Sequence, residues 1–184
     1  MVTVLDIRIR RYELDDAASV VEAVRKSLTD LQVWMPWCHS EYSIADSRSW
    51  LEQQVPAFDA GTAFEFAIVS TGGDYLGGCG LNQIDKVNHR ANLGYWVRSS
   101  VTRRGVATAA VQLIHEWAFK NTDLLRLEIV VAKENAASHR VAEKAGAVRE
   151  GVMRRRVLLH GVAHDATMFA FTRALSGSGA NGQA

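Results

Sequence analysis

One stretch constrains this chain more than any other: a strand pattern that runs through a basic loop directly into an amphipathic helix. Residues 91–98 have the character of a strand, and Arg103 and Arg104 add positive charge to the loop that follows. Apolar residues then recur at helical spacing, on a stripe formed by Val106, Ala110, Leu113, Ile114 and Trp117. The first turn of a helix has free N–H groups and a positive dipole end, so this junction is suited to bind a phosphate. Gly105 and Ala107 leave room for a diphosphate at the backbone, although a glycine before a helix is more often simply part of a loop.

Strand and helix patterns alternate along the rest of the chain. Before the loop, the patterns predict a strand at 4–10, helices at about 14–24 and 27–33, a helix with Asp46 as its N-cap, and a hairpin over 64–84 with its turn at 71–74. After it, they predict a strand at 125–131, a helix from the cap Asn135 to Gly146, and strands at 150–159 and 166–172 joined by a turn at 160–164. Gly77, Gly78 and Gly80 in the hairpin indicate a bulge or a close backbone approach. This order predicts a mixed α/β fold in one domain, residues 1–175, followed by a flexible tail at 176–184.

Composition argues against several classes of protein. The 184 residues include 21 basic and 20 acidic side chains, a net charge of +1, whereas a protein that binds nucleic acid usually has a clear basic excess. No run of about 18 apolar residues is present, which excludes a transmembrane helix, and the N-terminus lacks the apolar segment of a secretory leader. Cys38 and Cys79 form no CxxC pair, and no His, Cys and Asp cluster has metal-ligand spacing. We therefore expect a soluble cytoplasmic domain with reduced thiols and no metal.

Two common phosphate-binding motifs are absent. There is no GxxxxGK[ST], which argues against a nucleotide triphosphatase, and no GxGxxG after the first strand, which argues against a dinucleotide-binding unit. A second informative stretch, residues 134–146, places Asn135 at a helix N-terminus and Ser138 in the first turn. Taken alone these two residues need no function, because capping explains both.

Together, the two stretches resemble the GNAT superfamily of acetyl-CoA-dependent N-acetyltransferases. The loop is similar to the family pattern [QR]-x-x-G-x-[GA] over Thr102-Arg103-Arg104-Gly105-Val106-Ala107, and the second stretch is similar over Asn135-Ala136-Ala137-Ser138 and Glu143-Lys144-Ala145-Gly146. Three further segments look like the branch that acetylates ribosomal-protein N-termini: Leu93-Gly94-Tyr95-Trp96-Val97, Val148-Arg149-Glu150-Gly151 and Trp34-Met35-Pro36-Trp37. The resemblance covers roughly residues 5–172, nearly the whole chain.

The resemblance implies a twisted, mostly antiparallel seven-stranded sheet, flanked by helices, whose two central parallel strands splay apart. It implies that the pantetheine arm of acetyl-CoA enters this split and pairs with the strand at Trp96 and Val97. The diphosphate is expected on the loop and first helical turn, at Arg103, Arg104, Gly105, Val106, Ala107 and Thr108. Asn135 is expected to touch the pantetheine arm, and Ser138 to lie near the thioester sulfur as the catalytic acid.

Two positions depart from the family pattern. Thr102 replaces the first Gln or Arg of the loop, which removes one possible side-chain contact but leaves the backbone cradle. Asn92 stands where many relatives place a glutamate that acts as general base, and an amide cannot take up that proton. Either another group removes the proton, or the amine arrives already neutral from water.

The acceptor is expected to be a primary amine, and the branch favours a protein or peptide N-terminal α-amine. Trp34 and Trp37 either pack around Pro36 or line the acceptor cleft, and Asp165 either orients an amine or bonds its own turn. A small-molecule acceptor, such as an amino acid, a polyamine or an aminoglycoside, is an alternative. A catalytically silent CoA-binding module is another. The oligomeric state stays open, a homodimer included.

Overall fold

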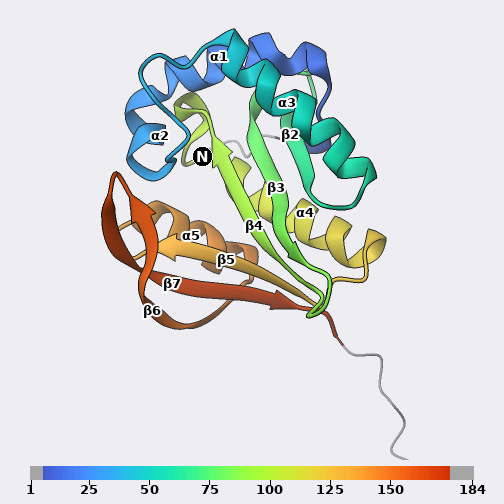
Figure 1. Ribbon diagram of the computed structural model, residues 1–184, viewed down its shortest axis with the longest axis vertical. Coiled ribbons are helices and arrows are strands. Elements are labelled where there is room, and N and C mark those ends of the chain that lie inside the picture. The colour runs from blue at the N-terminus through green and yellow to red at the C-terminus, as the bar shows by residue number, and fades with distance from the viewer. Residues whose placement is uncertain (1–5, 175–184) are drawn as a thin grey trace, which may run out of the picture.

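A computed structural model describes residues 6–174, which form a seven-stranded sheet with helices on both faces (Figure 1). The strands are β1 (Ile7–Arg11), β2 (Phe64–Ser70), β3 (Tyr75–Asp85), β4 (Arg90–Val97), β5 (Arg126–Ala132), β6 (Val148–Leu159) and β7 (Val162–Thr172). The helices are α1 (Ala17–Lys26), α2 (Leu28–Trp34), α3 (Ile44–Asp59), α4 (Val106–Asn121) and α5 (Ala136–Ala145), with short 3₁₀ turns η1 (Leu14–Asp16) and η2 (Ser99–Val101). The predicted tail at 176–184 lies outside the described residues.

The sheet has the order β1-β2-β3-β4-β5-β7-β6. The neighbouring strands are antiparallel with one exception, the parallel pair β4 and β5. The predicted mixed α/β fold with a mostly antiparallel seven-stranded sheet is therefore confirmed.

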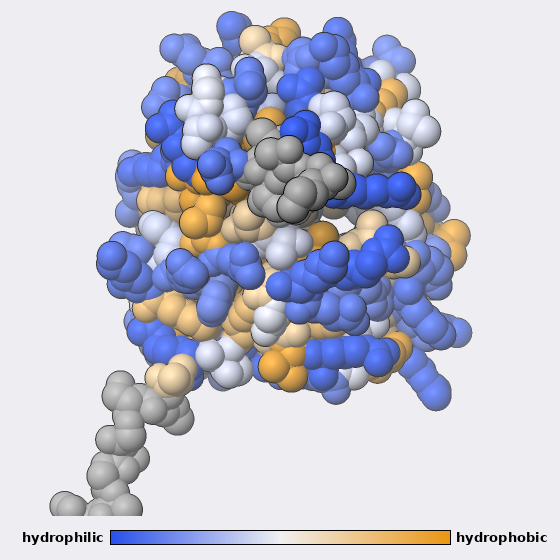
Figure 2. Space-filling model, turned by 180° about the vertical axis from the view of Figure 1, so that it is seen from behind, coloured by the Kyte–Doolittle hydropathy of each residue, from blue (hydrophilic) through white to orange (hydrophobic). Residues whose placement is uncertain are grey.

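Two apolar clusters, one on each face of the sheet, hold the helices in place. Alternate residues of β2 point to opposite faces, so that Phe66 and Ile68 pack under α4 while Ala67 and Val69 pack under α1 and α3. Seen from behind, hydrophilic residues make up most of the visible surface, with smaller apolar areas between them (Figure 2). Among the described residues, no helix is long and apolar enough to cross a membrane.

The start of α3 differs from the prediction. Ser43, not Asp46, is the N-cap: its hydroxyl accepts a hydrogen bond from the Asp46 N–H, and the Asp46 carboxylate accepts one from the Ser43 N–H at 2.8 Å. This reciprocal pair is a capping box, in which both residues are typical of helix starts. The prediction named Asp46, which lies three residues inside the helix from the true cap.

The last hairpin is also tighter than predicted. Only His160 and Gly161 form its turn, with φ of 49° and 78°, and Val162 already pairs with Leu159. Two consecutive positive φ values define the two-residue turn whose twist matches that of the flanking strands. Residues 162–164, predicted as part of the turn, and 165 therefore belong to β7.

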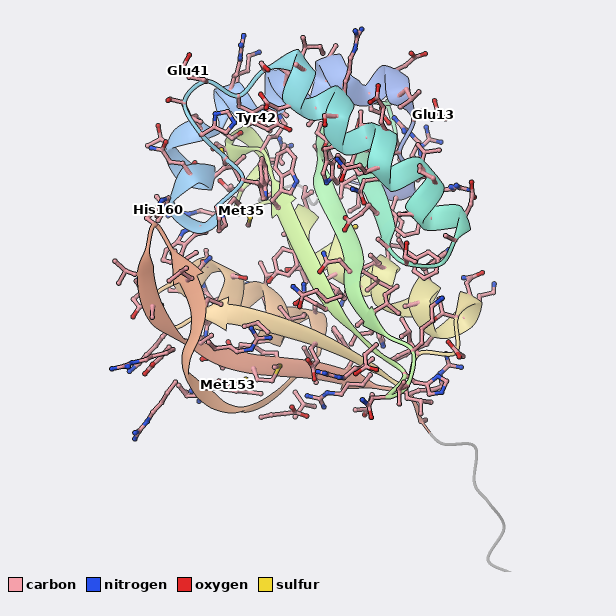
Figure 3. All side chains as sticks on the ribbon, in the orientation of Figure 1. Glu13, Met35, Glu41, Tyr42, Met153 and His160 are labelled. Atoms are coloured by element: carbon pink, nitrogen blue, oxygen red, sulfur yellow. The ribbon has the colours of Figure 1, made fainter. Side chains whose placement is uncertain are left out.

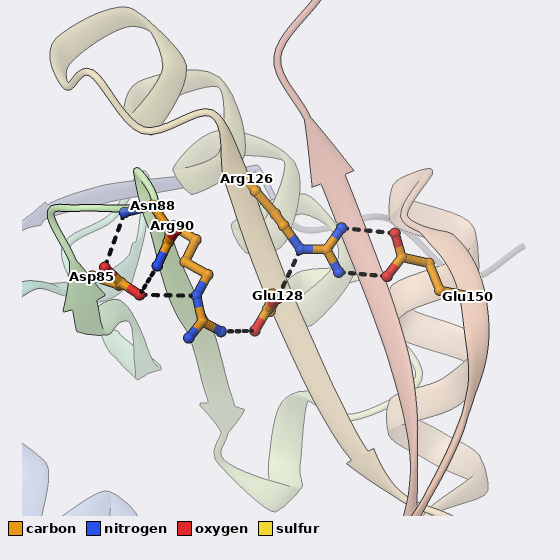
Figure 4. A network of polar contacts seen from close by, with 6 residues as sticks. All are labelled: Asp85, Asn88, Arg90, Arg126, Glu128 and Glu150. Carbon is orange, nitrogen blue, oxygen red and sulfur yellow. Dashed lines mark hydrogen bonds and ion pairs between the residues drawn. The ribbon is translucent and has the colours of Figure 1, made fainter.

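The parallel pair is short, and a polar network secures one end of it (Figure 4). Pairing extends only from Arg90↔Arg126 to Asn92↔Glu128. There Arg90 bonds both Asp85 and Glu128, and Arg126 donates to the second oxygen of Glu128 at 2.7 Å. Arg126 also forms a two-point ion pair with Glu150 across β7, and this lowers the pKa of Glu150. Four strands are thereby joined where β4 and β5 meet.

We predict that Arg126→Ala lowers stability by on the order of 1 kcal/mol, because two carboxylates lose a fork-shaped partner and Glu128 keeps only Arg90. Urea unfolding at low and high salt measures this loss, which should shrink with salt. Arg149→Ala, an exposed arginine on β6, is the control and should be neutral. Equal stability of the two variants would contradict the role of the network.

Candidate active site

β4 and β5 separate beyond Asn92 and Glu128, and a cavity of about 620 Å³ lies at this split; we call it the sheet cavity. Its walls come from both strands, from α2 and α3, and from β6 of the last hairpin. At the hairpin tip, a ring nitrogen of His160 lies 2.8 Å from the Gln32 carbonyl oxygen of α2 (Figure 3). The hairpin and α2 together therefore wall the cavity on that side.

A hydroxyl pair bridges the split. The Tyr95 hydroxyl on β4 lies 2.7 Å from the Ser138 Oγ on α5, and it also donates to the Ser138 carbonyl oxygen at 3.1 Å. Burial raises the pKa of Tyr95 to about 12, so this hydroxyl keeps its proton at neutral pH. The Asn135 side chain accepts a hydrogen bond from the Ser138 N–H at 3.0 Å, which confirms it as the helix cap. The sequence indicated Tyr95 only as part of a segment that resembles the family, because Ser138, its partner, lies 43 residues further along the chain.

The basic loop forms a second cavity of about 460 Å³, which we call the loop cavity. Arg103 and Gly105 have φ of 61° and 80°, and Gly105 is the N-cap of α4. This left-handed backbone turns the N–H groups of the first helical turn toward a common space. Nine of the ten predicted cofactor residues line the cavity: Trp96, Val97, Arg103, Gly105, Val106, Ala107, Thr108, Asn135 and Ser138. The tenth, Arg104, is not among its lining residues.

Two basic residues of this cavity received no role in the site from the sequence. Arg140 and Lys144 lie one helical turn apart on α5 and both line the loop cavity. Their four-residue spacing just after the Asn135 cap was the available indication. They add positive charge beside the backbone N–H groups of the loop.

The two cavities meet. Six residues line both of them: Trp34, Met35, Tyr95, Trp96, Asn135 and Ser138. Ser138, which the sequence assigned to the reacting end of the thioester, is therefore placed where a ligand in the loop cavity reaches the sheet cavity. This meeting point is the geometry that a transfer between two substrates requires.

The three predicted acceptor residues separate into two groups. Trp34 and Trp37 line the sheet cavity, and the ring of Trp37 packs against that of Trp96 with centroids 5.8 Å apart. Asp165 is not among the residues that line either cavity, and its carboxylate accepts a hydrogen bond from the Arg155 N–H at 2.9 Å. The contact that the structure gives Asp165 therefore joins the two strands of the β6–β7 hairpin and involves neither the turn at His160–Gly161 nor a cavity.

A polar row lies on the floor of the sheet cavity; the sequence pointed to Asn92, one of its members, but not to Asn82 or Glu65. The Asn92 amide donates to the Asn82 side-chain oxygen at 2.9 Å, and the Asn82 amide donates to Glu65 at 3.3 Å. Burial raises the pKa of Glu65 to about 7. Three strands supply these side chains, so no local motif brings the three together. No group of His, Cys, Asp and Glu in the described part of the chain could hold a metal ion.

The protein-family model of the acetyltransferase (GNAT) domain matches residues 6–148 of the sequence. The chain therefore belongs to the GNAT acetyltransferase family. It is an acetyl-CoA-dependent N-acetyltransferase.

Named relatives cover most of the chain. It is 26% identical over 174 residues to "Putative ribosomal N-acetyltransferase YdaF" of Bacillus subtilis, covering 91% of each protein. It is 28% identical over 150 residues to the ribosomal-protein-serine acetyltransferase of Escherichia coli, covering 81% of this chain and 83% of that one. A solved structure of RimL, a ribosomal α-N-protein acetyltransferase in complex with coenzyme A, superposes with a TM-score of 0.84 at 23% identity, covering 94% and 96% of the two chains. This last likeness shows the shared fold.

We predict that Gly105→Val weakens coenzyme A binding about 10-fold or more, which is at least about 1.4 kcal/mol. Valine disfavours a φ of 80°, and its branches occupy space beside the N–H groups of the loop. Calorimetric titration with coenzyme A measures the effect.

Gly73→Val is the matched control, since Gly73 has a φ of 95° in the β2–β3 turn and open space around it. This variant should unfold at a lower temperature yet bind coenzyme A normally. Normal binding by folded Gly105→Val would remove the loop from the cofactor site.

Proposed function

We propose that this enzyme transfers the acetyl group directly to the N-terminal α-amine of a protein or peptide, with both substrates bound at once. The observation that carries the proposal is the meeting of the loop cavity and the sheet cavity at Ser138 and Tyr95. One cavity has the basic residues and backbone N–H groups that suit a diphosphate, and the other has room for an acceptor.

The residues of the loop cavity fit acetyl-CoA. Gly105, without a side chain and at positive φ, leaves the backbone open to phosphate oxygens, and Arg103, Arg140 and Lys144 supply charge. Trp96 and Val97 offer the β4 edge, beyond its short pairing with β5, to the amide groups of the pantetheine arm. Acetyl-CoA supplies the acetyl group as a reactive thioester.

The sheet cavity suits a cationic amine at the end of a chain. Its walls are aromatic, with Trp34, Trp37 and Tyr42, and its carboxylates are Glu65 and Asp46. No lysine or arginine in the described part of the chain lines it. The Bacillus subtilis relative is named as a ribosomal N-acetyltransferase and the Escherichia coli relative as a ribosomal-protein-serine acetyltransferase, which supports a ribosomal-protein N-terminus as the acceptor.

Direct attack by the amine requires no covalent enzyme intermediate. Cys38 and Cys79 are both buried, and burial raises the pKa of both thiols, which disfavours the reactive thiolate. We therefore infer sequential kinetics, in which the acetyl group passes from one bound substrate to the other.

A panel of acceptors tests the proposed function, with release of the coenzyme A thiol as the measurement. We expect turnover with peptides that have a free N-terminus. We expect none when the same peptides are acetylated at the N-terminus, even though a lysine in them still offers a side-chain amine. Turnover only with polyamines, amino acids or aminoglycosides would identify a small-molecule enzyme. Tight coenzyme A binding without release for any amine would identify a silent binding module.

We predict that Ser138→Ala lowers kcat roughly 10²-fold while acetyl-CoA binding barely changes. The Ser138 hydroxyl, at the positive end of α5, can donate a proton to the departing sulfur, and a positioned donor typically contributes 10²–10⁴-fold. Such an interaction strengthens only in the transition state, so it affects kcat rather than binding.

The kcat and melting temperature of the same sample separate this role from a structural one. A variant that melts earlier but turns over within about threefold of wild type would show that Ser138 only partners Tyr95. Asn135→Ala should instead weaken coenzyme A binding and cost the helix about 1 kcal/mol through the lost cap. Ser19→Ala, exposed on α1, is the neutral control.

Two further points belong to the proposal. The cytoplasm is the compartment that we assign, because two free buried thiols suit a reducing environment. A homodimer stays a prediction, which sedimentation of the purified chain tests.

A further inference from the structure

A half-buried carboxylate, which has no cationic partner among residues 6–174, lies on the floor of the sheet cavity. Glu65 of β2 pairs in register with Gly80 of β3, and Gly80 pairs with Gly94 of β4. A Cβ built on Gly80 would lie 1.7 Å from the Glu65 Oε2 and 2.1 Å from its Cδ. The carboxylate therefore occupies the space that Gly80 leaves empty, flat against the sheet and partly exposed to the cavity.

Two asparagines hold this carboxylate. Asn82 is on the same face of β3 as Gly80, and its amide donates to the Glu65 Oε1. Asn92 pairs with Asn82 from the neighbouring strand β4. It donates a hydrogen bond to the Asn82 side-chain oxygen and so orients the Asn82 amide toward Glu65. Neither amide takes up a proton, which leaves Glu65 as the base of the row.

The surroundings raise the pKa of Glu65 toward neutral pH, where a general base is most effective. Loss of water raises its pKa to about 7, and the hydrogen bond from Asn82 opposes this rise. The other titratable groups that line the cavity are Tyr12, His39, Tyr42, Asp46, Cys79 and Tyr95. Of these, His39 lies 3.9 Å from Asp46, while burial keeps the hydroxyls and the thiol protonated.

We propose that Glu65 is the general base of this enzyme, taking the proton from the ammonium form of the acceptor amine in the sheet cavity, with Asn82 and Asn92 as its positioning residues. The proposal rests on the proposed function. It names the group that takes up the proton, which the amide of Asn92 cannot do. An incoming ammonium is also the missing counterion of the carboxylate.

The proton balance closes. The ammonium gives one proton to Glu65, which passes it to water. The neutral amine nitrogen then bonds to the acetyl carbon as the carbon–sulfur bond breaks, and sulfur keeps that electron pair. The second proton, released by the nitrogen as it becomes an amide, reaches the sulfur through the hydroxyl of Ser138.

Glu65→Gln tests the proposal, because it keeps the shape and the acceptor oxygen for Asn82 but does not titrate. At about pH 7 we expect kcat/KM to fall roughly 10²-fold, the usual size of a general-base contribution. The loss should shrink below about 10-fold by about pH 9.5, where an α-amine with a pKa of ~8 is already neutral. Turnover within about threefold of wild type at pH 7, or a loss independent of pH, overturns the proposal.

A second readout needs no activity. Because the pKa of Glu65 is higher in the folded than in the unfolded chain, the folded state binds more protons between about pH 4.5 and 7. This part of the stability is present below that window and is lost as the pH rises through it. Urea unfolding of Glu65→Gln should show a smaller fall in stability between about pH 5 and 8 than wild type, and an equal fall contradicts the titration of Glu65.

Gly80→Ala displaces the carboxylate without removing it. No positive φ strains alanine at this position, and the clash is with the end of a flexible side chain. We expect a loss of activity near that of Glu65→Gln and little further loss in the double variant. Additive losses would show that Gly80 acts independently of Glu65.

Glu116→Gln, exposed on α4 and outside both cavities, is the charge-matched control and should keep full activity. The two proposals fail in different ways. A wild-type enzyme that acetylates no amine refutes the proposed function, whereas an active enzyme indifferent to Glu65→Gln refutes only the role of Glu65.

Discussion

The early end of the β4–β5 pairing is the constraint on which the rest of the structure depends. Three residue pairs join these strands, and beyond Asn92 each strand keeps only its other neighbour, β3 or β7. Backbone groups left unpaired at a split need partners, and the proposed pantetheine arm would supply them. The ion-pair network around Arg126 and Glu128 holds one end of the pair together, and the contact between Tyr95 and Ser138 spans the open part. Both cavities follow from this one departure from a regular sheet.

Glycines of β3 determine which side chains fit against the sheet beside the sheet cavity. A Cβ on Gly78 would lie 2.5 Å from the Tyr12 hydroxyl and 3.0 Å from the Trp96 indole nitrogen, and one on Gly80 would overlap Glu65. Bulky aromatic and acidic side chains from neighbouring strands can therefore lie flat against the backbone. The glycine cluster of β3, which in the sequence indicated a close backbone approach, accommodates these side chains. Gly77 differs, because its Cβ would lie 2.2 Å from the Trp96 carbonyl oxygen, so here the glycine admits the β4 backbone itself.

Predictions that depended on neighbours in the chain were the more accurate ones. The stripe of α4, the Asn135 cap and Gly146 at the end of α5 were all predicted, because helical periodicity and capping involve residues within one or two turns. The errors are also local: the cap of α3 lies three residues earlier, and the last turn is three residues shorter. At the start of α3, Ser43 and Asp46 are both typical of helix starts, and the backbone makes Ser43 the cap; in the last hairpin, strand pairing extends β7 back to Val162.

The sequence by itself determined the order of strands and helices, the basic loop before α4 and the position of Ser138 in the first turn of α5, because each depends on short-range periodicity or on a contiguous motif. Only the tertiary structure decided which side chains share the sheet cavity. It placed Glu65, Asn82 and Asn92 in one row from three strands, and it bonded Asp165 within its hairpin, outside that cavity. A row across a sheet depends on strand register, which fixes contacts between residues far apart in the chain. The hydrogen bond from Asn82 to Glu65 depends on that register, and the raised pKa of Glu65 depends on its burial.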